Sequence, residues 1–124
     1  MPDITALLHA GLLVADLVRA RAFYETVLGL EPCARPQLPY PGVWYALGDG
    51  RQLHLMQLPD PDAGSVRPEH GGRDRHIAFA VRDLDALRDR LDAAGIACTA
   101  SRSGRAALFC RDPDGNALEF VAVE

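Results

Sequence analysis

The chain repeats itself, and this internal repeat constrains the fold more than any other feature of the sequence. In the clearest match, two segments each begin with His, run through mainly apolar residues to Val and end on Asp-Leu at the same spacing. Two further matches follow in the same order, with offsets that fall only from 67 to 65 residues. The matched segments are 9–17 with 76–84, 29–30 with 95–96, and 49–54 with 114–119. Three ordered matches predict two modules of similar length and similar fold.

Each module begins with an apolar run that is too short for a free-standing helix and is typical of a buried strand. In the first module Asp16 follows that run as a helix N-cap, apolar residues recur at helical spacing over 17–28, and Gly29 supplies a left-handed stop. Asp83 and Gly95 take the same places in the second module. The pattern thus predicts a strand followed by a helix in both modules.

Short apolar runs separated by turns follow each predicted helix. Runs at 43–47 and 52–57 flank Gly-Asp-Gly, and runs at 106–110 and 116–123 flank Asp-Pro-Asp-Gly. Asp-Gly between two strand-like runs is a hairpin signal. Four prolines within 31–42 exclude a helix or a central strand there. Each module is therefore expected to contain a strand, a helix and then two or three antiparallel strands.

Together these elements predict an α+β fold in which two tandem modules form one domain. A chain of 124 residues has the usual length of one compact domain, so we place a single domain at 1–124. The first module is expected at 5–57 and the second at 76–124. The connection at 58–75 holds three prolines and three glycines, and is either a tether or a functional lid.

Composition and charge exclude several classes of protein. The net charge is −4, and acidic residues and arginines are interspersed without the basic stripe of a nucleic-acid-binding protein. No window approaches the ~20 apolar residues of a membrane span, so we expect no membrane partner. The three cysteines are widely spaced and form no C-x-x-C pair, which argues against a disulfide framework and fits a reducing cytoplasm.

Four polar side chains occupy equivalent places in otherwise apolar strands. The repeat puts His9 and His76 on the first strand of each module, and His54 and Glu119 on the last strand. If the modules pair about a pseudo-twofold axis, these four side chains project into one cleft. Three imidazoles and one carboxylate suit one divalent ion of Zn, Ni, Mn, Fe or Co, and such a centre leaves positions open for substrate. We predict a metal there, and we expect His70, in the connection, to be a solvated loop residue.

Three stretches of the chain resemble the vicinal-oxygen-chelate superfamily, which includes glyoxalase I, fosfomycin-resistance thiol transferases, extradiol dioxygenases and metal-free bleomycin-binding proteins. They are Asp-Leu-x6-Tyr-x3-Leu-Gly-Leu at 16–30, His-Ile-Ala-Phe-Ala-Val at 76–81 and Asp-Pro-Asp-Gly-Asn-x-Leu-Glu-Phe at 112–120. The resemblance spans nearly the whole chain. It implies paired βαβββ modules around a U-shaped cleft, commonly in a homodimer.

The resemblance also implies roles for individual residues. His9, His76 and Glu119 match the His-His-Glu metal set that many members share. His54 matches a fourth ligand of glyoxalase I, which has a carboxylate at that place. Glu119 would then also be the group that carries a proton between substrate carbons. The first functional expectation is a metal-dependent enzyme similar to lactoylglutathione lyase, acting on a small oxygen-chelating substrate such as a thiol adduct.

Three other functions within the same superfamily stay open. A fosfomycin-type thiol transferase would use Arg102 and Arg105 to bind an anionic group. An extradiol dioxygenase would hold Fe(II) with the two-His-one-carboxylate set. A drug- or metabolite-binding protein without catalysis would use Trp44, Tyr45 and Tyr40 as stacking surfaces. Trp44 and Tyr45 are adjacent on a strand, however, so they cannot both face inward.

Overall fold

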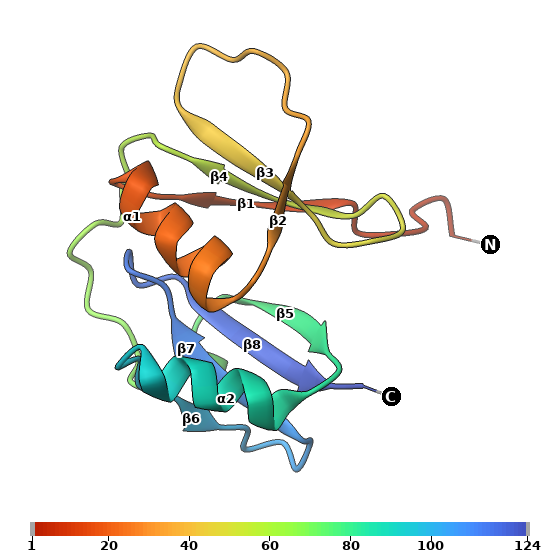
Figure 1. The fold of residues 1–124 in the computed structure, drawn as a ribbon, viewed down its shortest axis with the longest axis vertical. Coiled ribbons are helices and arrows are strands. Elements are labelled where there is room, and N and C mark those ends of the chain that lie inside the picture. Colours follow the sequence, from red (N-terminus) through yellow and green to blue (C-terminus); the bar gives the residue numbers. More distant parts are fainter. Residues whose placement is uncertain (1, 124) are drawn as a thin grey trace. The chain divides into compact units, whose positions relative to one another are not determined.

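The computed structural model describes residues 2–123, and the chain divides into two compact units, Met1–Asp60 and Pro61–Glu124. Each unit contains a four-stranded sheet and a helix (Figure 1). In both sheets the first strand pairs in parallel with the last strand, and the remaining pairs are antiparallel. This arrangement confirms the predicted α+β fold of two tandem modules.

The sheet of the first unit has the strand order β1-β4-β3-β2. Its β3–β4 turn contains Asp49 with a φ of 52°, between two glycines that also have positive φ values, so the Gly-Asp-Gly sequence suits this turn. Pro32 lies on β2, an edge strand, where a missing N–H removes little pairing. The strands are β1 His9–Leu13, β2 Glu31–Cys33, β3 Gly42–Ala46 and β4 Gln52–Met56.

The helix of the first unit starts as an α-helix and continues as a π-helix. The α-helical part, α1, covers Leu17–Arg21, and the π-helical part covers Ala22–Val27. Asp16 caps the helix as predicted, because its carboxylate accepts a hydrogen bond from the backbone N–H of Arg19 at 3.2 Å. The sequence predicted one helix over 17–28 but not its wider second half, since the spacing of apolar residues does not separate the two helix types.

A polar link joins this helix to the sheet beneath it. The hydroxyl of Tyr45, on β3, donates to Glu25 Oε2 at 2.9 Å, and Arg21 Nε donates to the same oxygen at 2.6 Å. The Arg21 hydrogen bond is the main reason that the pKa of Glu25 lies below its ordinary value, and the Tyr45 hydrogen bond adds to it. Burial raises the pKa of the fully buried Tyr45. The link fixes where the helix crosses β3.

The sheet of the second unit has the strand order β5-β8-β7-β6, and α2 covers Leu84–Ala93. Asp83 caps α2 as predicted by accepting a hydrogen bond from the backbone N–H of Ala86 at 2.9 Å. Gly95 follows the helix with a φ of 73°, the left-handed stop that the sequence indicated. A short 3-10 helix, Gly71–Arg73, precedes the sheet. The strands are β5 His76–Val81, β6 Thr99–Ala100, β7 Ala107–Arg111 and β8 Ala117–Ala122.

Strand alternation decides which side chains of β8 enter the core of the second unit. Leu118 and Phe120 are buried on the face that α2 covers, where Leu87 of the helix is also buried (Figure 1). Glu119 lies between them in sequence, so its side chain points to the opposite face, yet the residue is only 2% exposed. Because burying a carboxylate is costly, its place on the face away from the helix makes that face a candidate site.

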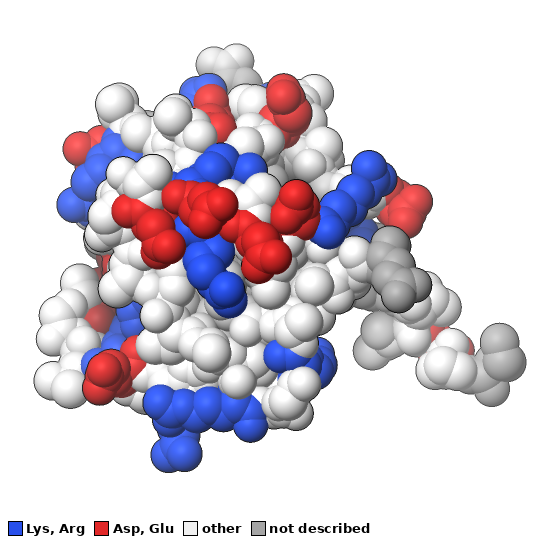
Figure 2. Space-filling view, turned by 60° about the horizontal axis from the view of Figure 1, so that its bottom comes forward, with Lys and Arg blue, Asp and Glu red and all other residues white. Residues whose placement is uncertain are grey.

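Charged side chains of both signs are mixed on the face of the molecule that Figure 2 shows, where Arg and acidic residues lie next to one another. This agrees with the interspersed charges of the sequence. Among the described residues, no helix combines the length and the apolar character needed to cross a membrane.

Candidate functional site

The first unit brings the predicted ligands His9 and His54 together. His9 begins β1 and His54 lies on the adjacent strand β4, and their rings stack with centroids 4.2 Å apart. Trp44, which is paired with His54 across β3 and β4, stacks on the same imidazole at 3.9 Å and nearly parallel. The His54 ring is thus held between two aromatic rings from the strands on either side of it.

The surroundings of His54 favour its neutral form. Burial lowers the pKa of His54, and the neighbouring His9 and Arg35 lower it further. Its Nε2 lies 2.8 Å from Gln52 Oε1, two residues earlier on the same strand. Because a metal binds neutral imidazole, His54 is ready to act as a ligand at neutral pH. It would offer Nδ1, or Nε2 once the hydrogen bond to Gln52 is broken.

The second unit brings together the other predicted pair, His76 and Glu119. His76 Nε2 lies 3.4 Å from Glu119 Oε1. The other ring nitrogen of His76, Nδ1, lies 2.8 Å from the carbonyl oxygen of Asp74 and donates to it. The other oxygen of Glu119, Oε2, accepts a hydrogen bond from Arg105 Nη2 at 2.9 Å. Each side chain is therefore oriented by one partner. The remaining metal-coordinating atoms, His76 Nε2 and Glu119 Oε1, point towards one another.

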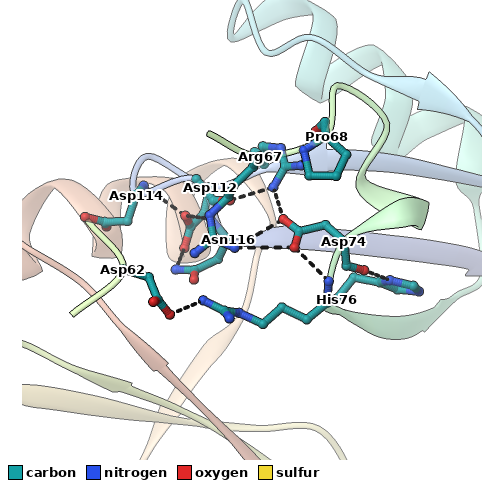
Figure 3. Close-up of polar contacts among 11 residues, drawn as sticks. Asp62, Arg67, Pro68, Asp74, His76, Asp112, Asp114 and Asn116 are labelled. Atoms are coloured by element: carbon teal, nitrogen blue, oxygen red, sulfur yellow. Dashed lines mark hydrogen bonds and ion pairs between the residues drawn. The ribbon is translucent and has the colours of Figure 1, made fainter. Parts of the chain in front are cut away.

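A network of ion pairs around Asp74 positions His76 (Figure 3). The Asp74 carboxylate accepts hydrogen bonds from Arg111 at 2.9 Å and from Arg67 at 3.2 Å. The hydrogen bond from Arg111 is the main reason that the pKa of Asp74 lies below its ordinary value, and the hydrogen bond from Arg67 adds to the effect. Arg111 also donates to the carbonyl oxygen of Gly115 at 2.8 Å. The network ties the connection before β5 to the β7–β8 turn and so fixes the backbone carbonyl that orients His76.

The Asp-Pro-Asp-Gly-Asn motif holds the turn that leads into β8. Asp112 Oδ1 accepts hydrogen bonds from the backbone N–H groups of Asp114 and Asn116, each at 2.9 Å, and Asp112 Oδ2 accepts one from the Asn116 side chain (Figure 3). Asp112 is buried. This part of the third stretch that carries the superfamily resemblance thus has a structural role, and it sets the start of the strand that bears Glu119.

The donor atoms of His76 and Glu119 fit a metal ion. Two donors about 2.1 Å from one ion lie roughly 3.0–3.4 Å apart in octahedral or tetrahedral geometry, which includes the distance between this nitrogen and oxygen. A ligating imidazole also commonly donates its second N–H to a backbone carbonyl, as His76 does to Asp74. Within residues 2–123, however, no three His, Cys, Asp or Glu side chains are grouped to hold an ion. Each unit supplies one pair, and the four-residue set stays a prediction.

A hollow of about 290 Å³ opens beside His76 and Glu119 in the second unit. Its walls are rich in cationic and hydroxyl groups, and Phe109 of β7 forms an aromatic part of the lining. The cationic and hydroxyl residues are Arg73, Arg102, Arg105, Ser101 and Ser103. Because Glu119 is the single carboxylate among the lining residues, the hollow is suited to an anionic ligand.

His70 also lines this hollow, and our expectation of a solvated loop residue was wrong. The residue is only 6% exposed, its Nδ1 lies 2.8 Å from Thr99 Oγ1, and its ring packs edge-on against Phe109 with centroids 4.8 Å apart. The following Gly71 and Gly72 have no side chains, so the connection can lie close against Phe109. The His-Gly-Gly sequence was the available signal for this close approach.

The remaining candidate residues separate into two groups. Arg102 and Arg105 line the hollow, and their predicted binding of an anionic group stays a prediction. Of the two adjacent aromatic residues, Trp44 stacks on His54, whereas Tyr45 is fully buried and bonded to Glu25. Tyr45 therefore offers no stacking surface to a ligand, which corrects one part of the binding-protein alternative.

Comparison with known protein families identifies the superfamily of this chain. The family described as Glyoxalase/Bleomycin resistance protein/Dioxygenase superfamily matches residues 6–120, so the chain belongs to this superfamily. This confirms the resemblance drawn from the sequence. The chain is 32% identical to a lactoylglutathione lyase of Haemophilus influenzae over 123 residues, which cover 93% of this chain and 90% of that protein.

Two further likenesses support the assignment. An ethylmalonyl-CoA/methylmalonyl-CoA epimerase of Cereibacter sphaeroides is 32% identical over 119 residues, covering 87% of this chain and 89% of the epimerase. The crystal structure of a glyoxalase family protein from Bacillus anthracis superposes with a TM-score of 0.80 and 23% identity, over 100% of this chain and 99% of that one. The structural match concerns the fold, while the two relatives connect the chain to a superfamily that contains enzymes.

Proposed function

We propose that the protein is a metal-dependent lyase or isomerase that moves a proton within a small substrate bearing neighbouring oxygen atoms. The observation that carries the proposal is the His76–Glu119 pair, whose donor atoms face one another at a metal-like separation. His9 and His54 are proposed to complete the ligand set of one divalent ion. Such an ion, when bound, stabilises negative charge on a substrate oxygen.

The proposed substrate class is a thioester or a related thiol adduct. Lactoylglutathione and methylmalonyl-CoA, the compounds in the names of the two relatives, are both thioesters with a hydrogen on the carbon next to the carbonyl group. Removing that hydrogen as a proton places negative charge on the carbonyl oxygen, which is where a metal and hydrogen-bond donors act. One site chemistry therefore serves isomerisation and epimerisation alike.

The chain's own residues have distinct tasks in this proposal. Glu119 is a metal ligand and, as the sequence indicated, a candidate proton carrier. Arg105 holds its Oε2, so that Oε1 remains directed towards His76. Arg73 and Arg102, on the wall of the hollow, bind the anionic part of the substrate. Trp44 stacks on the imidazole of His54 and so holds this proposed ligand in place in the first unit.

The arginine-lined hollow also favours a second candidate, a thiol transferase of the fosfomycin-resistance type. A phosphonate would bind Arg102 and Arg105 through paired hydrogen bonds, while the metal set stays the same. The two candidates differ in what they consume. The transferase joins a thiol to an epoxide, whereas the isomerase needs a single thioester substrate and exchanges its acidic hydrogen with solvent.

The proposal is tested first by elemental analysis of untagged protein prepared without chelators, followed by a titration of the metal-free protein. We expect close to one divalent ion per chain, and a marked loss of affinity in His76→Ala. The exposed Asp85→Asn variant on α2 serves as a control that leaves the affinity unchanged. Failure to bind any ion, even after ions are added back, would contradict the proposal and favour a metabolite-binding protein.

The reaction is tested by hydrogen exchange in D₂O. Metal-loaded protein is incubated with lactoylglutathione or methylmalonyl-CoA, and deuterium on the carbon next to the carbonyl group is followed by mass spectrometry. Incorporation with either thioester supports the isomerase. Consumption of fosfomycin together with a thiol, without exchange, would favour the transferase.

We further propose a homodimer, which the resemblance to the superfamily implies and which is the commonest closed assembly of soluble proteins. Light scattering measures the mass directly, and a monomer at micromolar concentration would refute this part of the proposal.

A further inference from the structure

His70 occupies an unusual place for a residue of an irregular connection. It is buried beside the proposed metal ligands, and two side chains fix its ring, namely Thr99 through Nδ1 and Phe109 through an edge contact. Gly72 makes room for the other edge of the ring, since a Cβ atom there would lie 2.7 Å from His70 Nε2. The ring is therefore held at Nδ1 by Thr99, while its Nε2 edge packs against Gly72 on the wall of the hollow, where a larger residue would not fit.

Burial and the charges around His70 together favour its neutral form. Burial lowers its pKa first, and Arg102, Arg73 and His76 lower it further, while Glu119 acts in the opposite direction. A neutral imidazole at pH 7 can accept a proton, and an imidazole among cationic groups releases that proton readily.

The other two titratable bases that line the hollow, Glu119 and His76, already have partners for their polar atoms. Glu119 receives Arg105 on one oxygen and faces His76 with the other. His76 uses Nδ1 for the carbonyl oxygen of Asp74 and turns Nε2 to Glu119. If these two side chains hold a metal, neither is well placed to shuttle a proton as well, because both have their donor atoms committed.

We propose that His70 is a proton carrier of this site, acting through Nε2 and oriented by Thr99. The inference rests on the proposed isomerase function and deepens it. The C–H bond next to the thioester carbonyl breaks, its electron pair moves to the carbonyl oxygen, and Nε2 takes the proton. The proton on Nε2 exchanges with solvent, and a proton from Nε2 then returns to the carbon as the electron pair moves back from the oxygen, so that no oxidant or further reactant is needed. His70 thereby takes the proton-carrying part for which Glu119 was the first candidate, and Glu119 remains a ligand throughout.

The proposal requires one tautomer. Thr99 Oγ1 accepts a hydrogen bond from Nδ1–H, so that Nε2 carries the lone pair. In metal-free protein labelled with ¹⁵N at histidine, His70 should give one protonated Nδ1 and one unprotonated Nε2 at neutral pH, with Thr99→Val as the variant that removes the preference. A protonated Nε2 in the wild-type protein would overturn the proposal, and this measurement is independent of any substrate.

The decisive variants are His70→Gln and His70→Asn. Asn places an amide near the position of Nδ1 and keeps a partner for Thr99, whereas Gln reaches towards the position of Nε2, and neither titrates. We expect both to lose solvent exchange of lactoylglutathione or methylmalonyl-CoA by about 100-fold or more, the usual contribution of a positioned base. Metal stoichiometry and affinity should stay at the wild-type values, which separates this role from that of a ligand.

The outcomes distinguish the two levels of the argument. Wild-type protein that binds metal and exchanges neither thioester contradicts the proposed function, and the role of His70 falls with it. Exchange in the wild type that persists within about threefold in His70→Gln contradicts the role of His70 alone. Loss of metal binding in both His70 variants would make it a structural support of the ligands instead of a proton carrier.

Discussion

Replacing Glu119 with Gln should separate the stability of the fold from the stability of the metal site. In metal-free protein the substitution removes a buried carboxylate whose dehydration costs several kcal/mol, and it weakens one hydrogen bond from the half-exposed Arg105, which contributes about 1.5–3 kcal/mol. The amide oxygen still accepts from Arg105. These terms oppose one another, so we expect metal-free Glu119→Gln to melt within about 4 °C of the wild type, or ~1 kcal/mol.

Addition of metal should then distinguish the two proteins. At an ion concentration 100 times the dissociation constant, binding stabilises the wild type by about 2.7 kcal/mol, or roughly 10 °C. Loss of a direct ligand weakens affinity by at least about 100-fold, since loss of a supporting residue alone costs 10–100-fold. The variant at the same concentration therefore gains only about 0.4 kcal/mol. Calorimetric melting curves with and without metal measure both numbers.

Two results would refute this reasoning. A metal-induced shift in Glu119→Gln equal to that of the wild type would remove Glu119 from the ligand set. A drop of more than about 3 kcal/mol in the unfolding free energy of the metal-free variant would show that the carboxylate is chiefly structural. Its main partner would then be Arg105 and not an ion. Asp85→Asn, an exposed charge on α2, is the matched control and should change neither number.

Three further predictions follow from single contacts. Tyr45→Phe removes a buried hydroxyl that donates to Glu25, so it should lower the free energy of unfolding by about 1–3 kcal/mol in urea titrations. Folding holds the pKa of Glu25 below its ordinary value of 4.5, so this carboxylate stabilises the protein above that pH. The stabilisation is lost as the pH falls through the lowered pKa. In melting experiments at different pH values, this acid-induced loss of stability should be smaller in Tyr45→Phe than in the wild type. Binding of Co(II) should quench the fluorescence of Trp44, the chain's single tryptophan, because its ring stacks on His54, and His54→Ala should abolish the saturable quenching. Asp112→Ala leaves two backbone N–H groups of the β7–β8 turn without their acceptor and should cost about 2–4 kcal/mol in urea, whereas a loss below 0.5 kcal/mol would mean that the turn does not need this carboxylate.

The fold was predictable because the repeat made each module a check on the other. Asp16 and Asp83 both cap helices, and both are followed at the helix end by a glycine with positive φ, as the paired sequence signals indicated. The parity of β8 was equally predictable, since Leu118 and Glu119 had to face opposite sides of a sheet. Capping residues and the alternation of side chains along a strand were enough to predict the structure wherever the backbone forms a regular helix or strand.

Contacts within the candidate site were predictable only where its residues lie on strands. His54 and Glu119 could be aligned with His9 and His76 because strand register is regular. His70 lies in an irregular segment, and so does Arg105, which was singled out from the sequence without its contact to Glu119. Burial of His70 requires Phe109 and Thr99, which lie about thirty or more residues away in sequence, and no periodicity encodes such a contact. The π-helical second half of the first helix was missed for a similar reason, since apolar spacing does not report helix width.

The two modules place their candidate site residues at equivalent strand positions but surround them differently. Trp44 lies opposite His54 across its strand pair, and Phe109 lies opposite Glu119 in the same way, so each module sets an aromatic residue beside its last proposed ligand. In the first unit that ring stacks on a neutral imidazole. In the second unit Phe109 instead packs against the edges of His70 and His76, beside a carboxylate and three arginines. Aromatic neighbours exclude water and strengthen electrostatic interactions around both pairs, but only the second unit adds charge and a candidate proton carrier. Changes of substrate are therefore expected to arise in the second unit, in the irregular segments 58–75 and 101–106, while the first unit would supply the other half of the proposed metal set.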